Sequence, residues 1–126
     1  MEVKTDTKEK FHVISVETDH LTANMTDELS RQLSTYLTHE NKNIVLKLNK
    51  VKSMDEEAAE TLVKTQQSFY ESGASFVICE LPEELESYLD SNDLLELMNV
   101  TPTESEAWDI VQMEEIEREL LGGMED

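Results

Sequence analysis

The sequence predicts an α/β domain with a largely parallel sheet. Short apolar runs rich in β-branched residues indicate strands at 11–17, 43–49 and 74–81. Segments between and after them carry apolar residues every three or four positions, which is typical of helices. Strands that alternate with helices in this way are characteristic of α/β domains. The chain has 126 residues, enough for one domain with a buried core and no disulfide support.

The amino-terminal half is predicted to hold two strands and a helix. Residues 1–10 are polar, so we expect them to fray or to form an edge strand at most. The alternating run 11–17 is the first strand, and 43–49 is the second. Between them, residues 26–39 form a helix whose apolar face consists of Met25, Leu29, Leu33, Tyr36 and Leu37.

The middle of the chain is predicted to contain a longer helix, a strand and a short helix. The apolar periodicity indicates a helix over about 55–71, and Gly73 suits the left-handed residue that ends many helices. The third strand, 74–81, follows. Pro82 then opens a short helix at its favoured first position.

A short turn at 93–98 and a last helix complete the predicted elements. Thr103 and Glu106 have the spacing of a capping box at the start of this helix. Trp108, Ile110 and Val111 are predicted to seal the helix onto the sheet.

Residues 113–126 are predicted to be an acidic helical extension of a domain that spans 1–112. Ile116, Leu120 and Leu121 form an apolar stripe with acidic neighbours in this extension. Such a stripe could dock on a partner or pair with a second copy as a homodimer.

The charge of the chain restricts its partners. Ten basic and 29 acidic residues give a net charge of −19. Nucleic acids and anionic membrane surfaces are therefore poor partners. A basic protein partner is one interpretation, and a solvated, repulsive surface that maintains solubility is the other.

The composition predicts a cytoplasmic protein. The one cysteine, Cys79, lies in an apolar run and is expected to be a buried thiol in a reducing compartment. The sequence has no secretory signal pattern and no apolar stretch long enough to span a membrane.

No motif indicates a cofactor, a metal site or an enzyme. The glycines, Gly73, Gly122 and Gly123, form no phosphate-binding loop. The histidines, His12, His20 and His39, lack the spacing of a zinc site. The residue types of a nucleophile–base–acid triad are present, but no nucleophile-elbow motif accompanies them.

Three consecutive acids, Asp55, Glu56 and Glu57, stand where an extended segment is predicted to become a helix. They can serve as a helix start, because first-turn acids favour the positive end of the helix dipole and Ser53 has capping-box spacing to Glu56. A metal site is the weaker alternative, since neighbouring positions at a helix start point in different directions. The third alternative is a surface that faces a partner.

Four segments together resemble the STAS domain of the anti-sigma factor antagonist (SpoIIAA-like) family. These segments are "LTANMTDEL", "NIVLKLNKVKSMDEEAAETL", "GASFVICELPEELESYL" and "LLELMNV", within a stretch that covers about residues 10–112. The resemblance implies a mixed or largely parallel sheet of four to five strands with about four helices. It also implies a non-enzymatic protein-interaction module without a cofactor.

The resemblance also implies where a partner binds. The family's motif reads aspartate, serine, serine, glycine, and it matches Asp55, Glu56, Glu57 and Ala58 here. Glu57 occupies the position of the serine that a partner kinase phosphorylates. Together with Thr22 and Asn24, these four residues form the expected partner-binding surface. A carboxylate carries about one negative charge where phosphoserine carries about 1.5 to 2, so Glu57 would imitate the modified state or make phosphorylation irrelevant.

Three functions follow in order of support. The first is an anti-sigma factor antagonist that binds a kinase-type anti-sigma factor or a related signalling complex without phosphorylation at the usual site. The second is a structural STAS subunit of a larger complex, such as a stressosome-like shell or a lipid-transport accessory. The last is a small metal-dependent enzyme that uses the acidic cluster.

Overall fold

A computed structural model describes residues 2–125 of the chain, with side chains described up to residue 121. The strands are β1 (Val3–Thr7), β2 (His12–Val16), β3 (His20–Leu21), β4 (Ile44–Lys47), β5 (Ser53–Met54), β6 (Phe76–Cys79) and β7 (Val100–Thr101). The helices are α1 (Ala23–Ser34), α2 (Glu56–Glu71), α3 (Glu83–Ser91) and α4 (Glu104–Glu125), and two 3₁₀ turns are η1 (Thr35–Thr38) and η2 (Leu95–Leu97).

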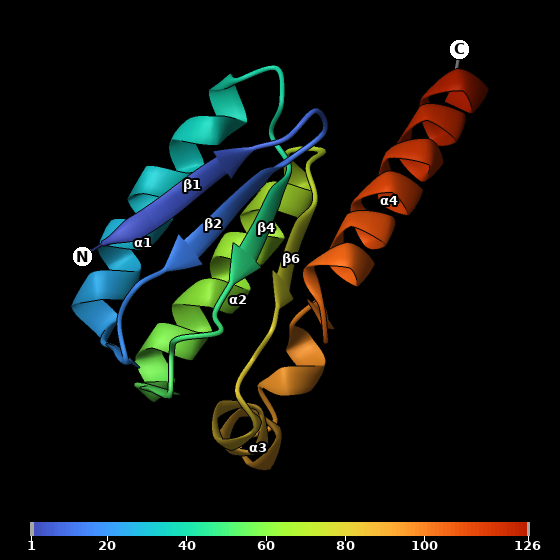
Figure 1. Ribbon diagram of the computed structural model, residues 1–126. Coiled ribbons are helices and arrows are strands. Elements are labelled where there is room, and N and C mark those ends of the chain that lie inside the picture. The colour runs from blue at the N-terminus through green and yellow to red at the C-terminus, as the bar shows by residue number, and fades with distance from the viewer. Residues whose placement is uncertain (1, 126) are drawn as a thin grey trace.

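The main sheet has five strands in the order β1-β2-β4-β6-β7 (Figure 1). β1 runs antiparallel to β2, and the remaining neighbours are parallel. The α/β prediction of a mixed, largely parallel sheet with about four helices is confirmed. The polar amino terminus does form an edge strand, because its backbone pairs with β2 from Val3 to Thr7.

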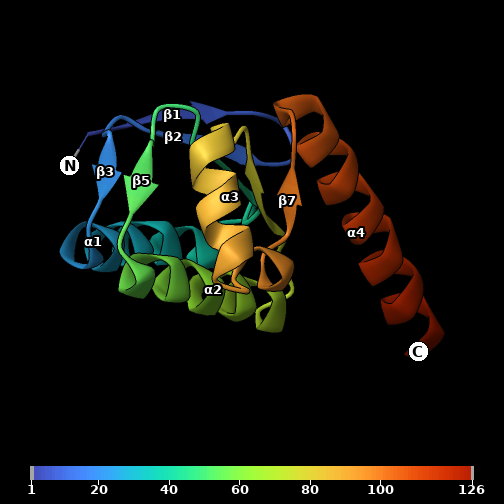
Figure 2. The same cartoon turned by 90° about the horizontal axis from the view of Figure 1, so that it is seen from below.

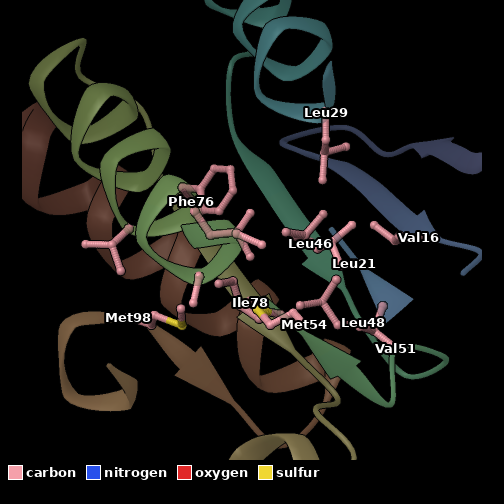
Figure 3. Packing of buried hydrophobic residues seen from close by; sticks show 14 of the residues in the cluster. Val16, Leu21, Leu29, Leu46, Leu48, Val51, Met54, Phe76, Ile78 and Met98 are labelled. Carbon is pink, nitrogen blue, oxygen red and sulfur yellow. The ribbon is translucent and has the colours of Figure 1, made fainter. Parts of the chain in front are cut away.

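The central strands are buried on both faces. On one face, side chains from β2, β4 and β6 pack against α1, α2 and α3 in the larger core. Leu29 of α1, Leu46 of β4 and Phe76 of β6 belong to this layer (Figure 3). On the other face, Val45 and Val77 pack against α4. A strand that is covered on both faces has a continuous apolar run in its sequence. Residues 43–49 and 74–81 show such runs, and this explains why the sequence predicts strands there.

Helix α2 ends as its sequence predicts. Gly73 has φ +76°, the left-handed conformation that glycine adopts without steric cost. Its N–H donates to Tyr70 O at 3.1 Å, and the Ala74 N–H donates to Phe69 O at 2.9 Å. These two bonds form a Schellman motif and satisfy carbonyl groups at the end of the helix.

Of two predicted helix starts, one differs from the structure and one agrees with it. Pro82 is the N-cap of α3 and not its first helical residue, since its ψ of 148° is extended. Thr103 does cap α4, because its hydroxyl accepts from the Glu106 N–H at 3.2 Å.

The packing of α4 also differs from prediction. Ala107 and Val111 are buried against the sheet, but Trp108 is 43% exposed. The position after Ala107 points in a different direction, and the Trp108 side chain borders a surface pocket with Lys8 and Phe11 of the β1–β2 turn. The prediction that Trp108 seals the helix onto the sheet is therefore wrong, whereas Val111 does so. The helix is continuous across the boundary predicted at 112/113.

Among the residues that the structure describes, no helix combines the length and apolar character needed to cross a membrane.

Candidate functional site

Two very short strands bring the predicted site residues together. β3 and β5 pair in parallel as a separate two-stranded sheet, with His20 opposite Ser53 and Leu21 opposite Met54. The Asp55 N–H extends this pairing by donating to Leu21 O at 3.0 Å. α1 follows β3 and α2 follows β5, so the amino ends of the two helices lie side by side at the end of the molecule away from α4 (Figure 2).

The Asp55 carboxylate joins these two helix starts. One oxygen accepts from the N–H of Ala23, the first residue of α1, at 3.1 Å. The other oxygen lies 3.1 Å from His20 Nε2. The first N–H groups of a helix have no partner inside the helix. Asp55 therefore stands at the N-cap position of α2 but uses its side chain to cap α1.

The predicted capping box between Ser53 and Glu56 does not form. Asp55 is the N-cap of α2 and makes no side-chain bond to its own helix. Ser53 is held extended by the β3–β5 pairing, and its hydroxyl lies 2.7 Å from His20 Nδ1. That hydroxyl is thereby engaged with a neighbouring strand and not with the helix that follows.

Thr22 and Asn24 flank this junction. Thr22 is the N-cap of α1, and its hydroxyl accepts from the Met25 N–H at 3.2 Å. Thr22 is half-buried, while Asn24 is exposed in the first turn of α1. Thr22 thus supports the helix start, and Asn24 offers its amide to the surface.

Glu56 and Glu57 are exposed in the first turn of α2. Neither carboxylate forms an ion pair or hydrogen bond with the side chains that the structure describes. The next residue, Ala58, is 0% exposed and belongs to the core. The six predicted positions therefore divide by role: Asp55 and Thr22 hold the two helix starts, Ala58 packs inside, and Asn24, Glu56 and Glu57 face solvent.

His20 is the site residue that sequence reasoning missed. Its ring lies between Ser53 Oγ and Asp55 Oδ1 and links β3 to the start of α2. The signal is weak in the sequence, because β3 and β5 have two residues each and no periodicity reveals so short a pairing.

The order serine, histidine, aspartate invites comparison with a catalytic relay. Such a relay works in a water-excluding site with donors aimed at the developing oxyanion. Here the side chains of His20 and Asp55 are 49% and 45% exposed, and one Asp55 oxygen is engaged by the Ala23 N–H. These three side chains can hold β3 against β5 and the start of α2. They lack the enclosure from water that general base catalysis requires.

The described residues contain no group of three or more histidine, cysteine, aspartate or glutamate side chains arranged to hold a metal. In the acidic run, Asp55 is directed toward His20 and Ala23, while Glu56 and Glu57 face solvent. The run therefore does not gather the converging oxygens that a hard cation prefers.

The other histidines lie elsewhere. The buried His12 ring is 4.4 Å from the Tyr36 ring and 6.5 Å from the His39 ring, measured between centroids. Both of its nitrogens are engaged, one with Thr7 Oγ1 and one with Asn41 O, each at 3.0 Å. The rings of this cluster contribute to the packing and the hydrogen bonding of the fold.

Cys79 is fully buried in the core layer beneath α4, as predicted. Burial raises the pKa of its thiol to about 12, and the neighbouring carboxylates of Glu80 and Glu104 add to the effect. A thiol that stays protonated is a poor nucleophile, so Cys79 is a packing residue.

A model of the STAS domain family matches residues 2–107. No curated protein matches the chain significantly.

Several solved structures share the fold. A STAS-domain anti-sigma factor antagonist from Planctomyces limnophilus is 16% identical, with a TM-score of 0.73 over 87% of this chain and 97% of that chain. A serine-to-glutamate variant of RsbS from Moorella thermoacetica is 15% identical, with a TM-score of 0.67 over 89% of this chain and 96% of that one. Phosphorylated SpoIIAA from Bacillus is 14% identical, with a TM-score of 0.62 over 87% of this chain and 99% of that one. At these identities the likeness establishes the fold.

Proposed function

Because this chain belongs to the STAS domain family, we propose that it is a non-enzymatic interaction module that binds a partner regulator through the amino ends of α1 and α2. The contact surface consists of Asn24, Glu56 and Glu57, held in place by Thr22 and Asp55. Ala58 is left out of this surface because it is buried.

The observation that carries the proposal is the pair of exposed carboxylates on a fixed platform. Glu56 and Glu57 face solvent while the residue before them, Asp55, ties α2 to α1 and to His20. A backbone that is already fixed loses little loop freedom on binding. Complementary charge mainly gives specificity and a fast association rate, so we expect a basic patch on the partner.

The resemblance to the anti-sigma factor antagonists gives Glu57 a specific role. This position corresponds to the serine that a kinase partner modifies in those proteins, and a glutamate has no hydroxyl to accept a phosphoryl group. Binding would then be set by a permanent charge. A kinase-type anti-sigma factor is the partner we favour.

Affinity capture tests this function. The tagged protein is recovered from its native cells as wild type, Glu57→Lys and Glu71→Lys, and the binding of the captured partner is then measured by calorimetry at low salt. Glu71 is an exposed acid at the other end of α2, so Glu71→Lys makes the same change in charge away from the surface. We expect Glu57→Lys to weaken binding at least tenfold, about 1.4 kcal/mol, and Glu71→Lys to bind as wild type.

Equal affinity of the two variants would contradict the proposed surface. A Glu57→Ser variant tests the kinase assignment, because a kinase-type partner supplied with ATP is expected to phosphorylate it and not the wild type. A captured transporter or shell component that is indifferent to position 57 would favour the structural-subunit alternative.

A further inference from the structure

Helix α4 turns one side toward the sheet along its described length. Ala107 and Val111 are buried on this side, and Glu114, Glu115 and Arg118 continue it at spacings of three and four residues. Residues at such spacings share one face of a helix. The inner face thus changes from apolar in the first turns to polar in the later ones.

Polar bonds fix the later turns to the body of the domain. The Tyr70 hydroxyl of α2 donates to Glu114 at 3.0 and 3.1 Å. On the next position, Glu115 Oε1 accepts from the buried Asn43 amide at 2.7 Å. The bonds therefore join α4 to α2 and to the residue before β4.

Arg118 completes this attachment. Its guanidinium donates to Ser75 Oγ at 3.1 Å and to Asn43 Oδ1 at 3.4 Å. Asn43 and Ser75 stand immediately before β4 and β6, and both are buried. Rotation of α4 about its axis would break these bonds and leave the buried Ser75 hydroxyl without its partner.

The opposite face of α4 carries large apolar side chains in solvent. Met113, Ile116 and Leu120 follow one another at spacings of three and four, and their exposed fractions are 56%, 56% and 63%. Leu121 is 60% exposed but is turned toward the side of Arg118, three residues before it. No side chain that the structure describes covers Met113, Ile116 and Leu120, which we call the α4 stripe. A contiguous apolar face on a helix is typical of an interaction site.

The charges around the α4 stripe determine which partner fits. Asp109, Glu117 and Glu119 flank it and are all exposed, and the one basic residue of the helix, Arg118, points inward to Ser75. A second copy of the chain would bring acids against acids. An anionic lipid surface would be repelled in the same way.

We propose that the α4 stripe binds a basic amphipathic helix of a partner protein. Apolar side chains of that helix would cover Met113, Ile116 and Leu120, and its lysines or arginines would face Glu117 and Glu119. This is the helix-on-apolar-face mode of recognition, with anchors at three- and four-residue spacing. Opposite charges at the rim set orientation and exclude acidic partners.

This surface is separate from the one proposed above. The start of α2 lies at one end of the molecule, and the second half of α4 projects at the other (Figures 1 and 2). Both surfaces could be occupied at once. A failure at the α4 stripe would leave the role of Glu57 unaffected.

A defined peptide tests the proposal. The probe is a synthetic helical peptide of three heptads with leucine at positions a and d and lysine at the flanking positions, and its binding to the full chain is followed by fluorescence anisotropy. The control peptide has the same composition in scrambled order. We expect the wild type to bind the patterned peptide at least tenfold more tightly than the scrambled one.

Variants of the chain connect this binding to the α4 stripe. Ile116→Ser combined with Leu120→Ser is expected to weaken binding at least tenfold. Leu97→Ser removes an apolar side chain of similar exposure, 53%, from η2 and is expected to have no effect. The double variant alters solvent-exposed positions only, so it should fold, and circular dichroism checks this.

Two results would overturn the proposal. One is equal peptide affinity for the wild type and the Ile116→Ser, Leu120→Ser variant, which would mean that the acidic surface attracts the peptide without the stripe. The other comes from sedimentation of the same samples. A dimer of the wild type that the double variant abolishes would make a second copy of the chain the occupant.

Discussion

Removal of the Asp55 carboxylate should loosen the junction of the two helix starts. In Asp55→Ala, the Ala23 N–H at the beginning of α1 loses its acceptor, and His20 Nε2 loses its partner. Since β3 and β5 have two residues each, little other pairing compensates. The first turns of α1 and α2 are therefore expected to separate more easily.

The magnitude follows from the two contacts. Loss of a helix-capping acceptor costs about 1 kcal/mol. The His20–Asp55 pair adds about 0.5 kcal/mol, because exposed fractions of 49% and 45% allow water to screen it. Together the free energy of unfolding should fall by about 1.5 kcal/mol, which for a domain of this size lowers Tm by roughly 6 °C.

Urea denaturation and thermal scans measure this change. Asp55→Asn keeps an oxygen for the Ala23 N–H, so it should lose only about half as much stability. Asp109→Ala is the matched control, since it removes an exposed carboxylate of α4 and should stay within about 0.5 kcal/mol of wild type. A double-mutant cycle with His20→Ala should give a coupling energy of about 0.2 to 1 kcal/mol.

The reasoning would be refuted if Asp55→Ala unfolded at the same urea concentration as Asp109→Ala. Such a result would mean that water satisfies the Ala23 N–H as well as the carboxylate does. The platform for Glu56 and Glu57 would then depend on core packing alone.

Three further predictions concern the body of the fold. Phe69→Ala removes a fully buried ring that lies 5.2 Å from the Phe76 ring, and urea denaturation should show a loss of about 3 to 5 kcal/mol. Burial, aided by the Glu114 carboxylate, raises the pKa of Tyr70 from 10.0 to about 12. The unfolded chain therefore loses the Tyr70 proton at a lower pH than the folded protein does. The free energy of unfolding should fall as pH rises from 10 to about 12. Tyr70→Phe should flatten that part of the pH profile, and an unchanged slope would assign the loss to other groups. Arg118→Ala should accelerate amide hydrogen exchange in the later turns of α4 at least tenfold and spare the first turns, whereas uniform exchange would show that the anchor is dispensable.

Much of the fold could be read from local patterns. The alternation of β-branched runs with helical periodicity predicted the α/β class, and Gly73 marked the end of α2, because both signals act within a few residues. The stripe of Ile116, Leu120 and Leu121 was also visible in the sequence, and its exposure is confirmed.

The structure shows contacts among the candidate site residues that the sequence did not predict. The motif resemblance located Asp55 and Glu57, but it could not tell that Asp55 caps the other helix. That role depends on the Ala23 N–H, 32 residues away in the chain. His20 escaped notice for the same reason, since its partners Ser53 and Asp55 lie 33 and 35 residues further on.

The sequence by itself determined the longer helices and the central strands, because periodicity and capping are properties of neighbouring residues. Only the tertiary structure decided where the polar side chains find partners. Arg118 illustrates the difference: in sequence it is one base among the acids of α4, and in the fold it reaches Ser75 and Asn43 beneath the helix. A buried polar group needs a hydrogen-bond partner, and that partner can come from any part of the chain. The pairing of β4 with β6 and the docking of α4 supplied that partner, and they left the apolar side of the later turns of α4 facing outward.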